Sequence, residues 1–315
     1  MIAKASALGI VLLLAAASLV PARADVVSVH DATGRTVRIT DPSRIVSIGG
    51  AVTETLYALG QQHRIVAVDT TSLFPPQAMR DKPNVGYVRQ LSPEGVLGLH
   101  PTLILAIEGA GPKEAVEVIE SAGIPFVHVP DRFTADGVIE RMRLIAAATQ
   151  AISLGDCLIA QVQKDFDALA AARARVRKPA RVLFVLSFVN GRAMVAGRNT
   201  AADGIIALAG AVNAMSQLDG YKPVSDESIL AAQPDAVLTM QRPNQTITAD
   251  EVFGHPAFVQ TKAAARHAFL SYEGLYLLGF GPRTAAAARE LAHALYPDLV
   301  TAPADRATTF DSCRR

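Results

Sequence analysis

Tyr87 and Arg89 are the pair of residues in this sequence with the clearest chemical potential. They lie in the run Gly86-Tyr87-Val88-Arg89-Gln90, and in an extended chain side chains two residues apart project to the same side. A nearby guanidinium favours the phenolate, whose hard anionic oxygen suits ferric iron, and tyrosine ligates haem iron in catalase. The pair therefore predicts a ferric haem site. The alternative is a Tyr ring packed on a loop beside an Arg that pairs with a surface acid.

Other chemistry is absent from the sequence. It contains no nucleotide-binding G-x-G-x-x-G or G-x-x-x-x-G-K-[ST] motif, no G-x-S-x-G elbow and no H-E-x-x-H pair. The seven histidines are scattered and form no metal-binding spacing. We therefore expect a binding protein that performs no covalent chemistry. A secreted α/β enzyme is the alternative from another class, and it would require turnover that depends on an acid or histidine in the cleft.

The first 24 residues read as a signal peptide. A short basic start containing Lys4 is followed by an apolar run from Ala5 to Val20 and an A-x-A cleavage site before Asp25. No other stretch is apolar for long enough to span a membrane. Cleavage would change the formal charge from 30 − 29 = +1 to 28 − 29 = −1, so nothing favours nucleic acid. We expect a protein of the bacterial periplasm that is not inserted in the membrane.

The elements that must position Tyr87 read as two lobes and a strut. Residues 25–150 and 179–300 each alternate short apolar strands with helices, which indicates parallel sheets covered on both faces. Between them, Ser153–Lys178 has apolar residues at spacings of three, four and seven, typical of one helix roughly 35 Å long. The predicted fold is α/β, with two Rossmann-like lobes joined by one long α-helix. Residues 301–315 remain as a tail.

The two lobes share a short repeat. The pattern Ser-x-Glu-x-x-Leu-x-x-x-Pro occurs at Ser92–Pro101 and again at Ser225–Pro234, and a Gly-Tyr pair precedes each copy. This repeat makes Tyr221 the counterpart of Tyr87 and predicts equivalent lobes that face each other across a ligand cleft. Parallel sheets bind ligands at the carboxyl ends of their strands, where the Tyr87 segment lies.

Two cysteines, Cys157 in the strut and Cys313 in the tail, leave two possibilities open. In an oxidising compartment they could pair and tie the tail to the strut. Otherwise Cys157 is a buried thiol and Cys313 a thiol in a frayed tail.

Several runs resemble the periplasmic substrate-binding proteins of ABC importers that carry haem, ferric siderophores or cobalamin. Ser47–Gly60 (SIGGAVTETLYALG) looks like that family's first strand and helix, and Gly86–Gly95 (GYVRQLSPEG) resembles its haem-specific branch. Gly197–Thr200 (GRNT) and Leu278–Thr284 (LGFGPRT) are further similar stretches. The resemblance covers about residues 40–297. It implies a monomer that binds haem as transported ligand and delivers it to an inner-membrane permease dimer; a siderophore or cobalamin carrier is the alternative.

The resemblance also implies roles for single residues. Tyr87 would be the axial ligand of ferric haem iron, and Arg89 would support its phenolate. Some relatives supply a histidine from the loop after the first strand of the second lobe, but here Ser187–Arg192 (SFVNGR) has none, so we expect five-coordinate iron or a different second ligand. Further candidates for the haem cleft are Tyr221, Arg192, Met194, Arg198 and Tyr272. Glu54 and Asp203 would be the acids at the outer tips of the two lobes that pair with arginines of the permease.

Overall fold

The computed structural model describes residues 26–243, 246–301 and 313. The predicted signal peptide, residues 1–24, lies outside the described residues. In the part that is described, no helix is both long enough and apolar enough to cross a membrane.

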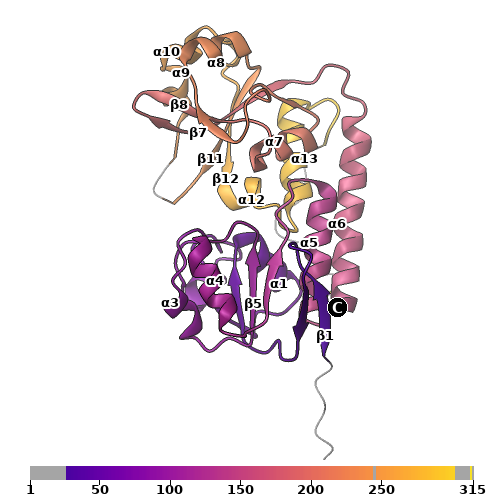
Figure 1. Ribbon diagram of the computed structural model, residues 1–315. Helices are drawn as coiled ribbons and strands as arrows, with labels where there is room; N and C mark the ends of the chain where they lie inside the picture. The colour runs from indigo at the N-terminus through magenta and orange to yellow at the C-terminus, as the bar shows by residue number, and fades with distance from the viewer. Residues whose placement is uncertain (1–25, 244–245, 302–312, 314–315) are drawn as a thin grey trace, which may run out of the picture.

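The first lobe is built on a four-stranded parallel sheet in the order β4-β3-β5-β6 (Figure 1). Its strands are short and almost wholly apolar, as strands covered on both faces must be. They are β3 (Ile45–Ile48), β4 (Ile65–Val68), β5 (Leu103–Ile107) and β6 (Phe126–Val129). The helices are α1 (Gly50–Ala58), α2 (Gln77–Asp81), α3 (Pro93–Leu97), α4 (Lys113–Ser121) and α5 (Ala135–Ala148). A separate antiparallel hairpin, β1 (Val27–His30) and β2 (Thr36–Ile39), precedes them.

The second lobe has a mixed sheet in the order β10-β8-β7-β11-β12, with β9 also beside β7. Its strands are β7 (Arg181–Val189), β8 (Arg192–Ala196), β9 (Val212–Asn213), β10 (Tyr221–Pro223), β11 (Ala236–Gln241) and β12 (Phe269–Glu273). Its helices are α7 (Ala201–Leu208), α8 (Asp226–Ala232), α9 (Ala249–Phe253), α10 (Pro256–Val259), α11 (Lys262–Ala265), α12 (Gly274–Leu278) and α13 (Thr284–Leu295).

The expected parallel sheet of the second lobe is parallel only in part. β7, β11 and β12 are parallel, but β8 and β10 pair antiparallel. The cause is the dipeptide Asn190-Gly191, whose φ angles of 51° and 72° form the tight hairpin turn that this pair favours. The stretch that reads as a loop in the sequence is therefore the end of a long hairpin.

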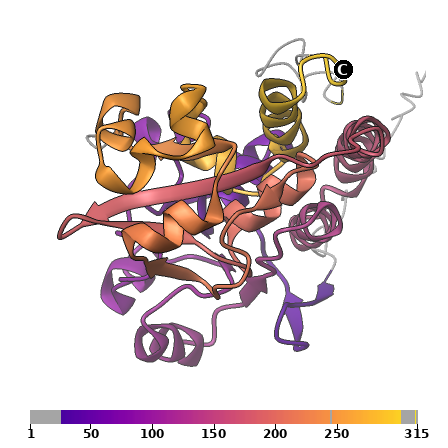
Figure 2. The same ribbon diagram turned by 90° about the horizontal axis from the view of Figure 1, so that it is seen from above.

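The long helix is confirmed as α6 (Ile152–Arg173), which has 22 residues and is about 33 Å long at 1.5 Å per residue. It ends at Arg173, five residues before the expected Lys178. Figure 1 shows it running along one side of both lobes, and in Figure 2 α13 lies on the same side of the molecule. Its buried stripe contains Leu158, Val162 and Phe166.

The two lobes share more than this helix. One continuous apolar core contains residues of α1 and α5 from the first lobe, of α6, and of α7 and α13 from the second. Each lobe also has a smaller core of its own. Two buried arginines cross between the lobes: Arg283 binds Glu54 through two side-chain bonds of 3.0 and 2.9 Å, and Arg141 donates to the carbonyls of Gly279 and Phe280. The lobes are therefore joined by packing and by buried charge as well as by α6.

Cys157 and Cys313 form a disulfide. Of the two possibilities that the sequence leaves open, a disulfide or two separate thiols, the structure has the disulfide. Cys157 is near the start of α6, so the bond holds the C-terminal end of the chain beside the first lobe (Figure 1).

Candidate functional site

Tyr87 lies on a tight turn rather than on an extended strand. Its carbonyl accepts a hydrogen bond from the N–H of Gln90 over 2.7 Å, which bends the chain at Val88 and Arg89. The preceding Gly86 has a φ of 93°, a conformation that side chains disfavour. The expectation of an extended run is therefore wrong. Tyr87 and Arg89 still line the same space, together with the buried Val88 between them.

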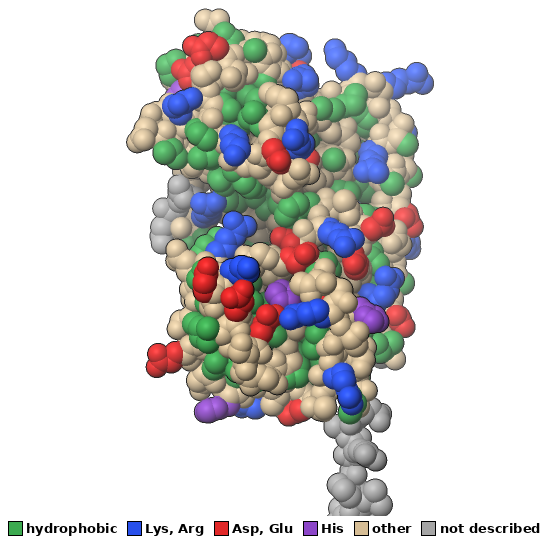
Figure 3. Space-filling view, viewed as in Figure 1, with side chains coloured by type: hydrophobic (Ala, Val, Ile, Leu, Met, Phe, Trp, Pro, Cys, Tyr) green, Lys and Arg blue, Asp and Glu red, His purple; other side chains and the backbone are tan. Residues whose placement is uncertain are grey.

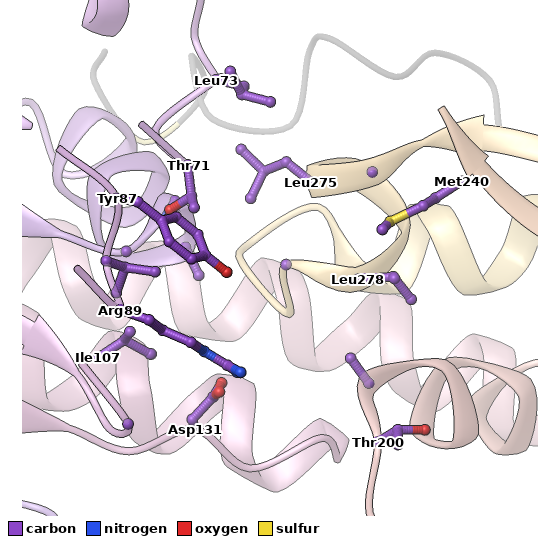
Figure 4. Close-up of a pocket in the computed structure, with 18 of the residues that line it drawn as sticks. Thr71, Leu73, Tyr87, Arg89, Ile107, Asp131, Thr200, Met240, Leu275 and Leu278 are labelled. Atoms are coloured by element: carbon purple, nitrogen blue, oxygen red, sulfur yellow. The ribbon is translucent and has the colours of Figure 1, made fainter. Parts of the chain in front are cut away.

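That space is a cavity of about 790 Å³ between the two lobes. This volume is within the usual range for small-molecule and cofactor sites. Figure 3 shows the surface hollowed between the lobes, and Figure 4 shows the side chains around the cavity. The apolar side chains of its wall come from both lobes and include Leu73, Val88, Ile107, Phe133, Met240, Leu275 and Leu278.

The wall is assembled largely at the carboxyl ends of parallel strands. Ile107 ends β5 and is followed by Glu108, Asp131 follows β6, and Met240 is close to the end of β11. This is where parallel sheets bind ligands. No sequence motif marks these residues, but each follows an apolar strand or lies at or near its end, and that position is the signal by which the sequence could identify them.

Tyr87 is 43% exposed and its hydroxyl points into the cavity. Among the described residues, the charged side chains that line the cavity are Arg89, Arg242, Glu108 and Asp131. Figure 4 shows Arg89 reaching past the ring of Tyr87 toward Asp131.

Tyr221 lines the cavity from the second lobe, as the repeat predicts. Burial raises the pKa of its phenol. Hydrogen bonds with the N–H of Ala202 and the side chain of Thr200, and the charges of Arg242 and Arg89, offset only part of this rise in pKa. The phenol of Tyr221 therefore stays protonated at neutral pH and is suited to donate a hydrogen bond rather than to bind iron.

Four further candidates do not line the cavity: Arg192, Met194, Arg198 and Tyr272. Arg192 begins β8 at the exposed end of the β7–β8 hairpin. Arg198 is turned toward Asp219. Tyr272 packs against the core shared by the lobes. The antiparallel hairpin accounts for Arg192 and Met194, which it places on β8 outside the cavity wall.

The prediction that Glu54 is a surface acid is wrong. Glu54 is only 2% exposed, and its carboxylate binds the guanidinium of Arg283 at the contact between the lobes. Asp203 is also misplaced as an outer tip: it is partly buried, accepts a bond of 3.0 Å from Asn213, and lies two residues beyond Ala201 of the cavity wall. Asp203 lies in the first turn of α7, where the helix dipole favours an acid whether it is exposed or partly buried.

Exposed acids at equivalent places in the two lobes are Glu94 and Glu227. Each lies in the first turn of a short helix, α3 or α8, whose N-cap is a serine. The signal was present in the sequence, since both are the glutamates of the Ser-x-Glu repeat.

The described residues contain no group of three or more His, Cys, Asp or Glu side chains that could hold a bare metal ion. The cavity instead offers the phenols of Tyr87 and Tyr221, the guanidinium groups of Arg89 and Arg242, and apolar side chains from both lobes. This arrangement suits a large, flat, largely apolar ligand that contains its own iron.

Comparisons with known proteins agree with this architecture. The chain is 38% identical to the periplasmic heme-binding protein BhuT, whose structure was solved with two hemes; the match has a TM-score of 0.76 and covers 82% of this chain and 99% of BhuT. It is 36% identical to the periplasmic heme-binding protein RhuT from Roseiflexus sp. RS-1, with a TM-score of 0.75 and coverage of 81% and 98%.

A more distant relative is the vitamin B12-binding protein of Pectobacterium carotovorum, which is 25% identical over 75% of this chain and 85% of that protein. The family model described as periplasmic binding protein matches residues 45–273. This match includes both sheets, the long helix and most of the cavity wall, so the chain belongs to the periplasmic binding protein family.

Proposed function

We propose that this protein binds ferric haem in the bacterial periplasm and delivers it to an ABC importer of the inner membrane. The carrying observation is the accessible phenol of Tyr87 on the wall of a cavity between two lobes. Export would follow cleavage of the predicted signal peptide, residues 1–24. The protein would act as a monomer and perform no covalent chemistry.

Several groups of the cavity wall would contribute to haem binding. The Tyr87 oxygen would bind the iron as a phenolate, which Arg89 stabilises by its charge. The apolar side chains from both lobes would cover the faces of the porphyrin. The protonated phenol of Tyr221 would donate a hydrogen bond from the second lobe. No histidine lines the cavity within the described chain, which supports iron with Tyr87 as its protein ligand.

The relatives support haem as the cargo. BhuT and RhuT are both described as heme-binding, and this chain matches each over almost its full length. The relatives that bind vitamin B12 are less similar in sequence, and they make cobalamin the second candidate.

A titration of the purified protein with ferric haem tests the proposal. We expect a Soret band and the absorbance of an iron–phenolate complex. Replacing Tyr87→Phe removes only the ligating oxygen, and we expect it to abolish the phenolate spectrum and weaken binding by at least about tenfold to a hundredfold. Tyr221→Phe is the matched control: it should leave the phenolate spectrum in place.

The same titration separates the alternatives. Cobalamin or a ferric siderophore needs no phenolate, so their binding would be insensitive to Tyr87→Phe. A protein that binds cobalamin tightly, and whose haem spectrum is the same with and without the Tyr87 oxygen, would contradict the proposal.

For the partner, we propose that Glu94 and Glu227 make the contact with the permease. A permease dimer presents two equivalent surfaces, and these two carboxylates are exposed at equivalent positions of the two lobes. Their charge would pair with basic residues of the two subunits, which gives orientation and speeds association.

A further inference from the structure

Asp131 is a carboxylate of the cavity wall that the proposed haem site does not use. Its side chain is 31% exposed. Its Oδ1 accepts a bond of 2.8 Å from Nη2 of Arg141, and its backbone N–H donates to Glu108. Arg141 is fully buried and also donates to the carbonyls of Gly279 and Phe280 in the other lobe. The buried Arg141 therefore holds the Asp131 carboxylate in place.

The side chain of Arg89 extends toward this carboxylate. Figure 4 shows its side chain extending past Tyr87 with the guanidinium toward Asp131. Burial raises the pKa of Asp131, and the charges of Arg141 and Arg89 act against that rise, so Arg89 is within electrostatic reach. Glu108 is the other anion beside Asp131, and Tyr221 is the group of the second lobe that the charge of Arg89 reaches.

We infer that Asp131 is a positioning residue that competes with the Tyr87 phenolate for Arg89 and so weakens the bond between the phenolate and haem iron. The inference rests on the proposed function. When the Arg89 guanidinium points at the fixed Asp131 carboxylate, it stabilises the Tyr87 phenolate less than it would if it pointed at the phenolate. The negative charge of Asp131 itself also opposes a phenolate nearby, so both effects act in the same direction. Because a carrier must give up its cargo, this competition would set how readily haem is released.

Asp131→Asn tests the inference. The amide is nearly the same shape and keeps an oxygen for Arg141, but it carries no charge to hold Arg89. We expect haem transfer to apomyoglobin to become roughly three- to tenfold slower, and the iron–phenolate charge-transfer band to shift as the bond strengthens. In an Arg89→Ala background the effect of Asp131→Asn should be clearly smaller, because the residue being competed for is gone.

Asp136→Asn is the matched control, since Asp136 is an exposed acid outside the cavity wall. It should leave both the transfer rate and the band unchanged. If Asp131→Asn proves unstable without haem, Asp131→Ser keeps a hydroxyl acceptor for Arg141 and is measured instead. Faster or unchanged release, or an equal effect with and without Arg89, would overturn the inference. The proposed function would fail by a separate result: the Tyr87→Phe variant would have the same haem spectrum as the wild-type protein.

Discussion

At the scale of single residues, burial decides what a charged side chain does. Glu54 and Asp131 are both carboxylates held by arginines, but the Glu54 pair is closed off between the lobes while Asp131 opens onto the cavity. Arg283 is enclosed further by Phe74, whose ring centroid lies 3.5 Å from the guanidinium carbon. The Glu54–Arg283 pair is therefore structural, and the group around Asp131 and Arg89 is available to a ligand.

Breaking the buried pair should cost far more stability than breaking an exposed one. Glu54→Gln leaves the charge of Arg283 buried without its counter-ion, and we expect the free energy of unfolding to fall by about 3–5 kcal/mol. The exposed pair Arg80–Asp81 has a similar separation, 2.7 Å, and serves as control; Asp81→Asn should leave the free energy of unfolding almost unchanged, because water screens this pair. Urea denaturation measures both. Equal losses would show that the Glu54 pair is not desolvated in solution.

The double change Glu54→Leu with Arg283→Met separates charge from shape. Replacing both charges by apolar groups removes the burial penalty together with the attraction, so most of the lost stability should return. If the double variant is as unstable as Glu54→Gln, the pair contributes mainly through its hydrogen bonds to the lobe contact.

At the scale of elements, α6 depends on close packing against α5. Gly155 of α6 is buried, and a Cβ built there would lie 2.5 Å from the Cβ of Ala146 in α5. This contact explains a glycine inside a long helix, where it otherwise costs about 1 kcal/mol relative to alanine.

Gly155→Ala therefore sets two effects against each other. The gain in helix propensity is about 1 kcal/mol, whereas overpacking costs about 1–3 kcal/mol. We expect a net loss of stability by thermal or urea unfolding. The paired change Ala146→Gly should relieve the overlap and restore part of the loss. A more stable Gly155→Ala protein would mean that the two helices separate easily.

At the scale of the whole molecule, the lobes form a largely preformed cleft. The shared core, two buried arginines and α6 all join them, and the disulfide returns the C-terminal end to the first lobe. The proposed capture of haem then needs little closure, and Glu94 and Glu227, the proposed contacts with the permease, are held at a nearly constant separation.

Charge reversal at Glu94 and Glu227 tests the proposed contact with the permease. In proteoliposomes that contain the permease, Glu94→Lys with Glu227→Lys should reduce haem uptake by roughly tenfold or more through repulsion at both contacts. Haem affinity should be unchanged, since neither residue lines the cavity. Glu114→Lys with Glu251→Lys makes the same change in net charge at exposed acids of both lobes and should transport normally. Normal uptake by the Glu94 and Glu227 variant would remove these residues from the docking surface.

The sequence by itself determined the local features of this protein: the apolar strands, the long helix, the repeat between the lobes and the Tyr87 segment. Each depends on periodicity or on neighbouring residue types, which the chain displays directly. Only the tertiary structure decided which acids are buried, that β8 turns back on β7, and that Arg89 points toward Asp131. Burial and charge partners depend on residues far apart in the chain, as with Glu54 and Arg283, and no local pattern records them.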